Sequence, residues 1–181
     1  MNTPASPDTD STYWQTPLTG AGISLRPLVA EDFEPLHAAA SDPLIWEQHP
    51  QPTRWQREVF RSAFFEGALA CGSAYVVLDN AAGAIIGSTR YYDWWPQTRE
   101  IAIGYTFLAR PYWRTGANQQ MKQLMLTHAF ARAATVWFHV GEHNWRSRRA
   151  LEKIGARFSH QEGARVFYRL DKRADPSRHS Q

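Results

Sequence analysis

The sequence predicts an α/β (α+β) fold: a mixed, mostly antiparallel twisted sheet of about six or seven strands flanked by about four helices. Runs of β-rich and helical spacing follow one another in the order strand, two helices, three strands, helix, strand, helix and two strands. Two neighbouring runs, 73–79 and 84–92, are separated by a short segment ending in Gly83, which is typical of an antiparallel hairpin. The 181 residues, 43% of them apolar, suit one globular domain.

The first elements are a strand and two helices. Ile23 and Leu25 alternate with polar residues along the first expected strand. The segment 30–41 (AEDFEPLHAAAS) begins with acidic residues, which stabilise a helix N-terminus. After a proline-rich stretch, Thr53 is expected to cap a second helix. Its apolar face is expected to consist of Trp55, Val59, Phe60, Ala63 and Phe64.

The middle of the chain contains the strands expected at the centre of the sheet. Segment 100–108 alternates strictly and is the candidate central strand. One of its faces is expected to carry Ile101, Ile103, Tyr105 and Phe107, and the other Ala102, Gly104, Thr106 and Leu108. The aromatic segment 91–96 (YYDWWP) is placed in the turn before this strand, where it could line a cleft or a dimer contact.

The remaining elements alternate between helix and strand. Segment 118–134 has helical spacing, with Met121, Leu124, Met125 and His128 on one stripe. A strand is expected over 135–140 and a short helix over 144–154, ending at Gly155. Two short strands, 157–160 and 164–170, complete the sheet.

The two ends of the chain are polar. Residues 1–16 and 172–181 are expected to be flexible, which leaves a folded domain over 17–171. The N-terminus has neither the basic start nor the apolar run of a signal peptide, and no segment is apolar for long enough to span a membrane. A single cysteine, Cys71, excludes an intramolecular disulfide. A cytoplasmic protein without a membrane partner is therefore expected.

Charge and motifs exclude several function classes. The formal net charge is only +3, and the arginines are scattered, so nucleic acid is not an expected partner. A rival hypothesis, a nucleic-acid or ribosome-associated protein, would use Arg146, Arg148, Arg149 and Lys153. His139 and His143 straddle a strand and a loop, so no metal site is expected. The phosphate-loop, dinucleotide and nucleophile-elbow motifs are missing.

Two segments indicate a site for an anionic cofactor. ARPYWRTGAN joins the central strand to a helix, and a glycine turn there offers free backbone N–H groups to a phosphate. EHNWRSRRALEKIGA places Asn144 and Ser147 three residues apart, on one helix face with basic neighbours. Together these segments resemble the cofactor half of the Gcn5-related N-acetyltransferase (GNAT) family, in the branch of ribosomal-protein-alanine acetyltransferases. The resemblance covers about 23–170.

The resemblance implies that acetyl-CoA is the cosubstrate. The turn before the helix would bind the pyrophosphate through its backbone, and the end of the central strand would pair with the pantetheine arm as an added strand does. Asn144 would hold the arm from the other side, and Ser147 would lie near the sulfur. The residues implied for the turn are Arg114, Thr115, Gly116, Ala117 and Asn118, and those for the strand are Phe107, Leu108 and Ala109.

The implied reaction is transfer of an acetyl group to a primary amine, either a protein N-terminus or a small molecule. The family's strand often reads Glu-Ile-Gly-Tyr, but Ala102 stands at the position of the acid. Glu100, two residues earlier on the same face, is the substitute catalytic candidate, and Asp93 and His139 are further candidate bases. At pH 7 a neutral α-amine costs roughly 1.4 kcal/mol and a neutral lysine roughly 4.6 kcal/mol, so a missing acid matters less for α-amines.

Ser147 and Tyr168 are the candidates that would protonate the departing thiolate. The alternative to an enzyme is a module that binds acyl-CoA without turning it over, which Ala102 makes worth testing. A homodimer is possible. Neither the acceptor nor the acyl chain is specified by the sequence.

Overall fold

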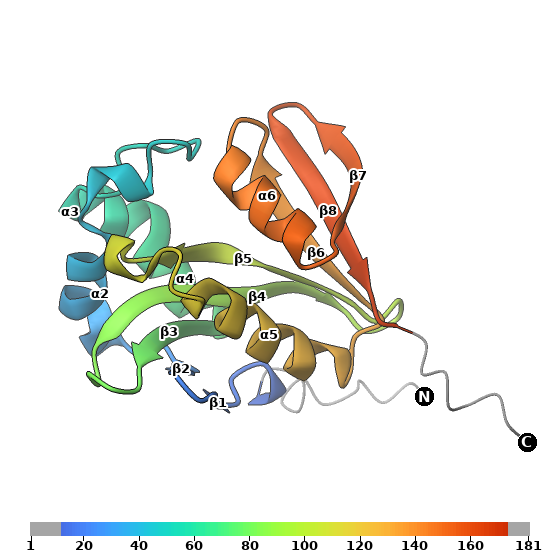
Figure 1. Cartoon of the computed structure of the whole chain (residues 1–181), viewed down its shortest axis with the longest axis horizontal. Coiled ribbons are helices and arrows are strands. Elements are labelled where there is room, and N and C mark those ends of the chain that lie inside the picture. The colour runs from blue at the N-terminus through green and yellow to red at the C-terminus, as the bar shows by residue number, and fades with distance from the viewer. Residues whose placement is uncertain (1–11, 174–181) are drawn as a thin grey trace, which may run out of the picture.

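The computed structural model describes residues 12–173, which form one twisted sheet with helices on both faces (Figure 1). The eight strands within this range follow the order β1-β2-β3-β4-β5-β6-β8-β7. Their bounds are β1 Leu18–Thr19, β2 Ile23–Pro27, β3 Ala74–Asp79, β4 Ile85–Trp95, β5 Glu100–Leu108, β6 Thr135–Gly141, β7 Arg157–Glu162 and β8 Arg165–Asp171. The predicted mixed sheet is confirmed, with eight strands in place of six or seven. All described neighbours are antiparallel except β5 and β6.

The helices divide between the two faces of the sheet. On one face lie α2 (Phe33–Ala40), α3 (Arg57–Phe60) and α4 (Glu66–Cys71), and on the other α5 (Ala117–Phe130) and α6 (Trp145–Lys153). Short 3-10 turns occur at Ala30–Asp32, Pro43–Ile45 and Arg110–Tyr112. Each face buries its own hydrophobic cluster, because the side chains of a strand alternate between them. The α5 cluster includes Tyr91, Ile101, Ile103, Met121 and Met125, and the α2–α4 cluster includes Phe33, Phe60, Phe64, Phe65 and Phe107.

The second predicted helix begins later than expected. Thr53 lies in a turn, and Gln56 is the N-cap residue of α3, so the prediction that Thr53 caps this helix was wrong. The helical segment from 57 to 71 has a π-helical turn at Arg61–Phe65 in its middle. The extra residue per turn lets adjacent Phe64 and Phe65 both be buried, which an α-helical wheel does not predict.

The strict alternation predicted for 100–108 breaks at a β-bulge in β5. Gly104 pairs with Arg90 and Phe107 pairs with Ser88, so two residues of β5 oppose the single Thr89 of β4. Tyr105, one of the two, has a φ of 50°. Phe107 consequently packs with the α2–α4 cluster and Leu108 with the α5 cluster, the reverse of the predicted faces. The prediction holds before the bulge and fails after it.

The expected turn 91–96 is largely strand, since β4 continues to Trp95. Trp94 packs against Trp14, at a ring-centroid distance of 5.1 Å, whereas Trp95 is 52% exposed. The two tryptophans thus lie on opposite faces of β4, one in the core and one on the surface.

The packed domain begins before the expected boundary at residue 17. Trp14 is only 4% exposed and lies in the α5 cluster, and the Tyr13 hydroxyl donates a hydrogen bond to the His128 carbonyl of α5 at 2.7 Å. Residues 12–16 therefore belong to the fold. The rest of the expected flexible ends, 1–11 and 174–181, lies outside the described residues.

Candidate functional site

The sheet forks between β5 and β6. These parallel strands pair only over Glu100–Ala102 and Thr135–Trp137. Beyond them β5 remains paired with β4, and β6 remains paired with β8, so the sheet divides into two wings that separate in Figure 1. Backbone groups of β5 past Ala102 consequently face a gap instead of a neighbouring strand. The family resemblance implies that a pantetheine arm pairs with this stretch of β5.

The predicted phosphate turn lies at the N-terminus of α5, past the open end of β5. Gly116 is the N-cap residue, with a φ of 88°, and a Cβ placed there would meet no atom within 4 Å. Arg114 and Thr115 are also exposed, whereas Ala117 is buried. Within the described chain, the backbone N–H groups of Thr115, Gly116 and Asn118 make no hydrogen bond. Free amides at a helix N-terminus suit a pyrophosphate, so the turn fits coenzyme A.

The end of β5 is only partly available to a pantetheine arm. The Ala109 N–H donates to the Ile86 carbonyl of β4 at 2.8 Å, so it is already used. Because alternate residues of an antiparallel strand direct their backbone groups to opposite sides, Leu108 directs its own toward the fork, and Phe107 toward β4. The Leu108 carbonyl accepts the Trp113 indole N–H at 2.9 Å. Of the three predicted strand residues, Leu108 has the orientation required.

Asn144 and Ser147 meet at the first turn of α6, on the far wing of the fork. The Asn144 Oδ1 caps the helix by accepting a hydrogen bond from the Ser147 N–H at 3.2 Å. This capping role leaves the Asn144 amide NH₂ without a partner in the described chain, and the Ser147 hydroxyl likewise makes no hydrogen bond there. Both groups keep donors for a ligand.

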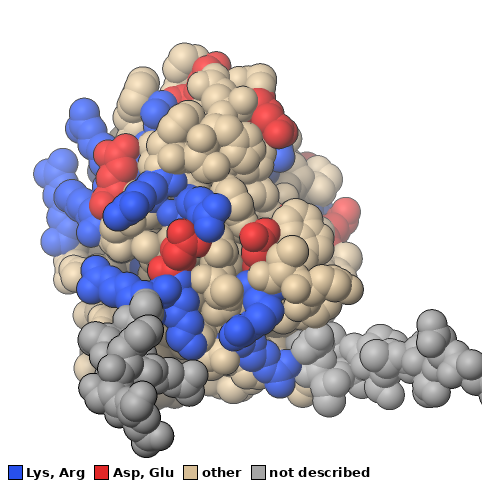
Figure 2. Space-filling model, turned by 90° about the vertical axis from the view of Figure 1, so that its right-hand side faces the viewer, with Lys and Arg blue, Asp and Glu red and all other residues tan. Residues whose placement is uncertain are grey.

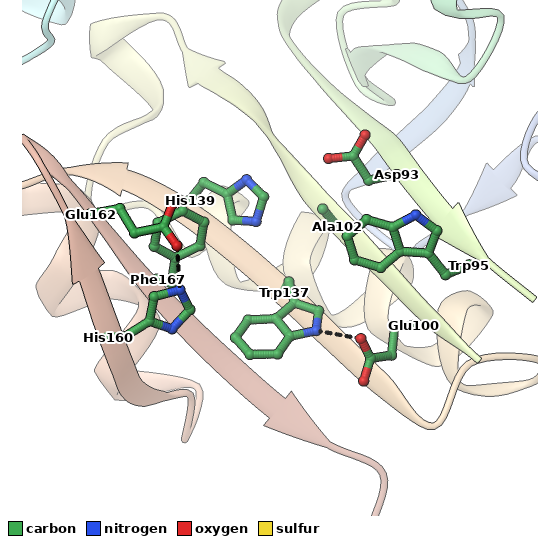
Figure 3. Close-up of a pocket in the computed structure, with 9 residues that line it drawn as sticks. All are labelled: Asp93, Trp95, Glu100, Ala102, Trp137, His139, His160, Glu162 and Phe167. Carbon is green, nitrogen blue, oxygen red and sulfur yellow. Dashed lines mark hydrogen bonds and ion pairs between the residues drawn. The ribbon is translucent and has the colours of Figure 1, made fainter. Parts of the chain in front are cut away.

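A cavity of about 250 Å³ lies at the base of the fork, lined by the side chains that Figure 3 draws as sticks. Three strands beside the fork supply the side chains of the predicted bases: Asp93 from β4, Glu100 from β5 and His139 from β6. The structure therefore brings all three candidate bases together. Ala102, Trp95, Trp137, His160, Glu162 and Phe167 complete the lining.

Hydrogen bonding orients one candidate base of the cavity, and burial keeps another neutral. The Trp137 indole N–H donates to Glu100 Oε2 at 3.2 Å, which orients that carboxylate (Figure 3). Burial lowers the pKa of the His139 imidazole below its ordinary value of 6.5, and the neighbouring Arg165 lowers it further. His139 is consequently neutral at pH 7 and can accept a proton. It is also two residues beyond Trp137, the last residue of β6 that pairs with β5.

Tyr168 does not reach this cavity. It is 1% exposed, packs under α6 in the α5 cluster and lies on the opposite face of β8 from Phe167. Its hydroxyl donates to Glu152 Oε1 at 3.0 Å and accepts from Arg148 Nε at 3.2 Å. Strand alternation directs its side chain away from Glu100 and the other candidate bases, and both hydrogen bonds of its hydroxyl are to neighbouring side chains of the fold.

Sequence reasoning missed three buried basic residues: Arg54, Arg90 and Lys122, each 7% exposed. Burial lowers the pKa of Lys122 to about 8, and its ammonium lies 5.2 Å from the Phe138 ring centroid. No sequence pattern marks these residues, because long basic side chains normally lie at the surface.

The segment between α2 and α3 contacts the far wing of the fork. The Arg146 guanidinium of α6 donates to the Ile45 carbonyl at 3.0 Å and lies 4.1 Å from the Trp113 ring centroid. Arg148 donates to the Glu142 carbonyl at 2.8 Å. Two of the four residues proposed for a nucleic-acid surface are thus engaged within the fold. On the face shown in Figure 2, Asp and Glu side chains lie among the Lys and Arg side chains.

Within residues 12–173, no group of three or more His, Cys, Asp and Glu side chains is placed to hold a metal ion. None of the helices in that range has the length and apolarity to cross a membrane.

A sheet that forks beside a turn of free amides defines a protein able to hold an extended, anionic ligand between two strands. The acetyltransferase (GNAT) domain model matches residues 23–157, and the chain therefore belongs to the GNAT acetyltransferase family. No curated protein matches the sequence.

Solved structures share the fold over most of their length. A "putative acetyltransferase" from T. thermophilus is 28% identical, with a TM-score of 0.69 over 86% of this chain and 88% of that one. A GCN5-related N-acetyltransferase from Brucella melitensis is 19% identical, with a TM-score of 0.71 over 87% and 79%. A GNAT-family acetyltransferase from Bacillus anthracis is 17% identical, with a TM-score of 0.70 over 86% and 98%.

Proposed function

We propose that this protein transfers the acetyl group of acetyl-CoA to a primary amine, by direct attack of the amine nitrogen on the thioester. The observation that carries the proposal is the fork itself. Free amides of the α5 turn lie at its open end, and three side chains that could accept a proton lie where the two strands meet. A cosubstrate held along the Leu108 edge would direct its acyl end toward Ala102, next to that cavity.

His139 is the base that the geometry favours. An amine must lose a proton to become a nucleophile, and a neutral imidazole at the fork can accept it directly or through water. Glu100 and Asp93 line the same cavity and attract an ammonium group to it, so they assist binding before the proton leaves. His139 therefore replaces Glu100 as the first candidate, with Glu100 as a positioning residue.

Ser147 is the proposed proton donor to the thiolate. It lies in the first turn of α6, on the far wing of the fork, and its hydroxyl is free within the described chain. The positive end of the α6 dipole, roughly half an elementary charge, also favours a developing thiolate there. Tyr168 has no part in this scheme, because its hydroxyl is engaged by Glu152 and Arg148.

Calorimetric titration of acetyl-CoA into the wild type and Gly116→Trp tests the cofactor site. The matched control is Gly163→Trp, since Gly163 also has a positive φ (56°) and open space around its Cα but lies in the β7–β8 turn. We expect micromolar binding in the wild type and the control, and its loss in Gly116→Trp. Equal binding by all three would place the cofactor elsewhere.

Turnover separates the enzyme from the binding module. Thiol release from acetyl-CoA in the presence of a panel of primary amines is expected to be acceptor-dependent. Binding of acetyl-CoA without release of thiol for any amine would instead support a non-catalytic acyl-CoA-binding module, which the substitution of Ala102 for an acid makes a specific alternative.

A further inference from the structure

Two buried arginines lie beside the candidate acceptor cavity without a carboxylate partner. Arg90 is on β4 and Arg54 precedes α3, and both are 7% exposed. Within residues 12–173 neither forms an ion pair, whereas Arg26 and Arg57 pair with Asp32 and Glu34. Burying a guanidinium without an opposite charge is unfavourable, so these two charges call for an explanation.

Neutral groups satisfy the two arginines only in part. Arg54 donates to Gln51 Oε1 from Nε at 3.0 Å and from its terminal nitrogen at 2.7 Å, and its other terminal nitrogen lies 3.3 Å from His49 Nε2. The Arg90 Nε has no hydrogen-bond partner, and its Cζ lies 3.3 Å from the Tyr105 ring centroid. Cation–π contacts and neutral acceptors stabilise a cation but leave its charge in place.

The two charges are close enough to affect each other. Burial lowers the pKa of Arg54 to about 10; Tyr105 opposes this effect, and Arg90 adds to it. Burial, with Arg54 as the second cause, also lowers the pKa of His49 to about 4, so this imidazole is neutral at pH 7. At pH 7 the cluster thus carries the charge of both guanidinium groups and no compensating anion.

Tyr92 lies between the two arginines, Arg54 and Arg90, and His139, the proposed base. Arg90 pairs with Gly104, and Tyr92 pairs with Ala102, so all four residues project from the same face of the sheet. The Tyr92 ring centroid is 5.4 Å from that of Tyr105 and 5.4 Å from that of His139. Tyr105, which covers Arg90, is 42% exposed, so its ring is what separates the Arg90 guanidinium from solvent on this face.

The same face therefore has an anionic end, with Asp93, Glu100 and Glu162, and a cationic end, with Arg54 and Arg90. We propose that Arg54 and Arg90 bind an anionic group of the acceptor, so that the acceptor is a small primary amine that also carries a carboxylate or a phosphate. This inference rests on the proposed function and specifies its substrate class. Guanidinium groups bind both anions through charge-assisted hydrogen bonds.

Matched pairs of acceptors test the proposal. An amino-acid series and the corresponding carboxamides differ in the carboxylate, and O-phosphoethanolamine and ethanolamine differ in the phosphate. In each pair the neutral member has the less basic amine, because a nearby anion stabilises the ammonium form. Amine basicity alone would therefore favour the neutral member. We expect the anionic member to have the higher kcat/KM in one of the two series. That series shows whether the recognised anion is a carboxylate or a phosphate.

Arg90→Gln and Arg54→Gln are expected to raise KM for the anionic member by roughly tenfold to a hundredfold and to leave the neutral member unchanged. Arg90→Lys, which keeps the charge, should restore part of the preference. Arg61→Gln is the control, since Arg61 lies in the helical segment that follows Arg54 and its guanidinium stacks on Phe33 of α2, away from the cavity. A thermal melt checks folding, and the melting temperature of Arg90→Gln should not fall, because an uncompensated buried charge is removed.

The outcomes separate this inference from the proposed function. Acetylation of anionic and neutral members at equal rates overturns the inference and leaves the transferase intact. If no amine is acetylated, calorimetric binding of the anionic probes to the CoA-loaded protein decides the matter. Binding lost in Arg90→Gln supports the anion site in a non-catalytic protein, and absence of binding to the wild type overturns it.

Discussion

Ala102 and Trp137 are the last residues of β5 and β6 that lie in register, and the strands separate immediately beyond them. This one pair fixes three features of the site. It sets the depth of the fork, it places the small Ala102 side chain in the cavity wall, and it positions His139 as the next residue of β6 on the same face. In the proposed reaction the methyl group of Ala102 cannot accept a proton, so another residue of the cavity would have to do so.

The first prediction concerns His139. His139→Gln should lower kcat by about a hundredfold or more, since a positioned base contributes on the order of 10²–10⁴. Burial depresses the pKa of His139, so the base-competent form persists below pH 6.5, and the acid limb of the kcat profile should fall there. Glu100→Gln should mainly raise KM. Unchanged kcat in His139→Gln would transfer the role of base to Glu100 or Asp93.

The second prediction concerns Trp14, which packs in the core although it lies before the expected boundary at residue 17. Its ring contacts Tyr91, Trp94 and His128, and its indole N–H is buried without a hydrogen-bond partner. Trp14→Ala should lower the free energy of unfolding by about 3–5 kcal/mol. Trp14→Phe should cost much less, because it removes an unsatisfied donor and keeps most of the packing. Chemical denaturation of both variants checks this, and equal small losses would place residue 14 outside the core.

The sequence predicted the order of the elements well, because hydrophobic period and turn residues are local signals. It failed where one extra residue changed the register: the bulge at Tyr105 reverses the faces of Phe107 and Leu108, and the π-helical turn buries both Phe64 and Phe65. Neither insertion leaves a compositional signal.

For the site, the backbone turn at Gly116 was predictable, since a glycine before a helix is visible in the sequence. The proximity of Arg54 to Arg90 was not predictable, because these residues lie in segments that only the tertiary fold brings together. The engagement of the Tyr168 hydroxyl by Glu152 and Arg148 was not predictable either, because it joins β8 to α6 across the tertiary fold.

The third prediction follows from Lys122. Its pKa falls from 10.5 to about 8 on folding through burial, so between these values the unfolded chain binds more protons than the folded chain. Stability should therefore rise with pH through this window, by about 1–2 kcal/mol between pH 8 and 9.5. Lys122→Met should lack this slope and be at least as stable as the wild type at pH 7. A wild type whose stability is flat over this range would mean that Lys122 gains a partner in solution.

The fourth prediction separates two roles of Asn144. Its Oδ1 caps α6 through the Ser147 N–H, whereas its amide NH₂ is the group available to the pantetheine arm. Asn144→Ala removes both and should lower the free energy of unfolding by about 1 kcal/mol while weakening acetyl-CoA binding. Asn144→Asp keeps the capping oxygen, so it should retain stability and still lose affinity, because a carboxylate has no N–H to donate.

Thermal melts and acetyl-CoA titrations on the two variants give four independent values. Ser159→Ala is a suitable control for both measurements, since Ser159 is exposed on β7 and bonds only to the adjacent His160. If Asn144→Asp binds acetyl-CoA as tightly as the wild type, the amide contributes nothing to the cofactor, and Asn144 acts through the helix cap alone. If Asn144→Asp is destabilised as much as Asn144→Ala, the cap geometry requires the neutral amide, and loss of affinity would then follow from loss of the α6 turn.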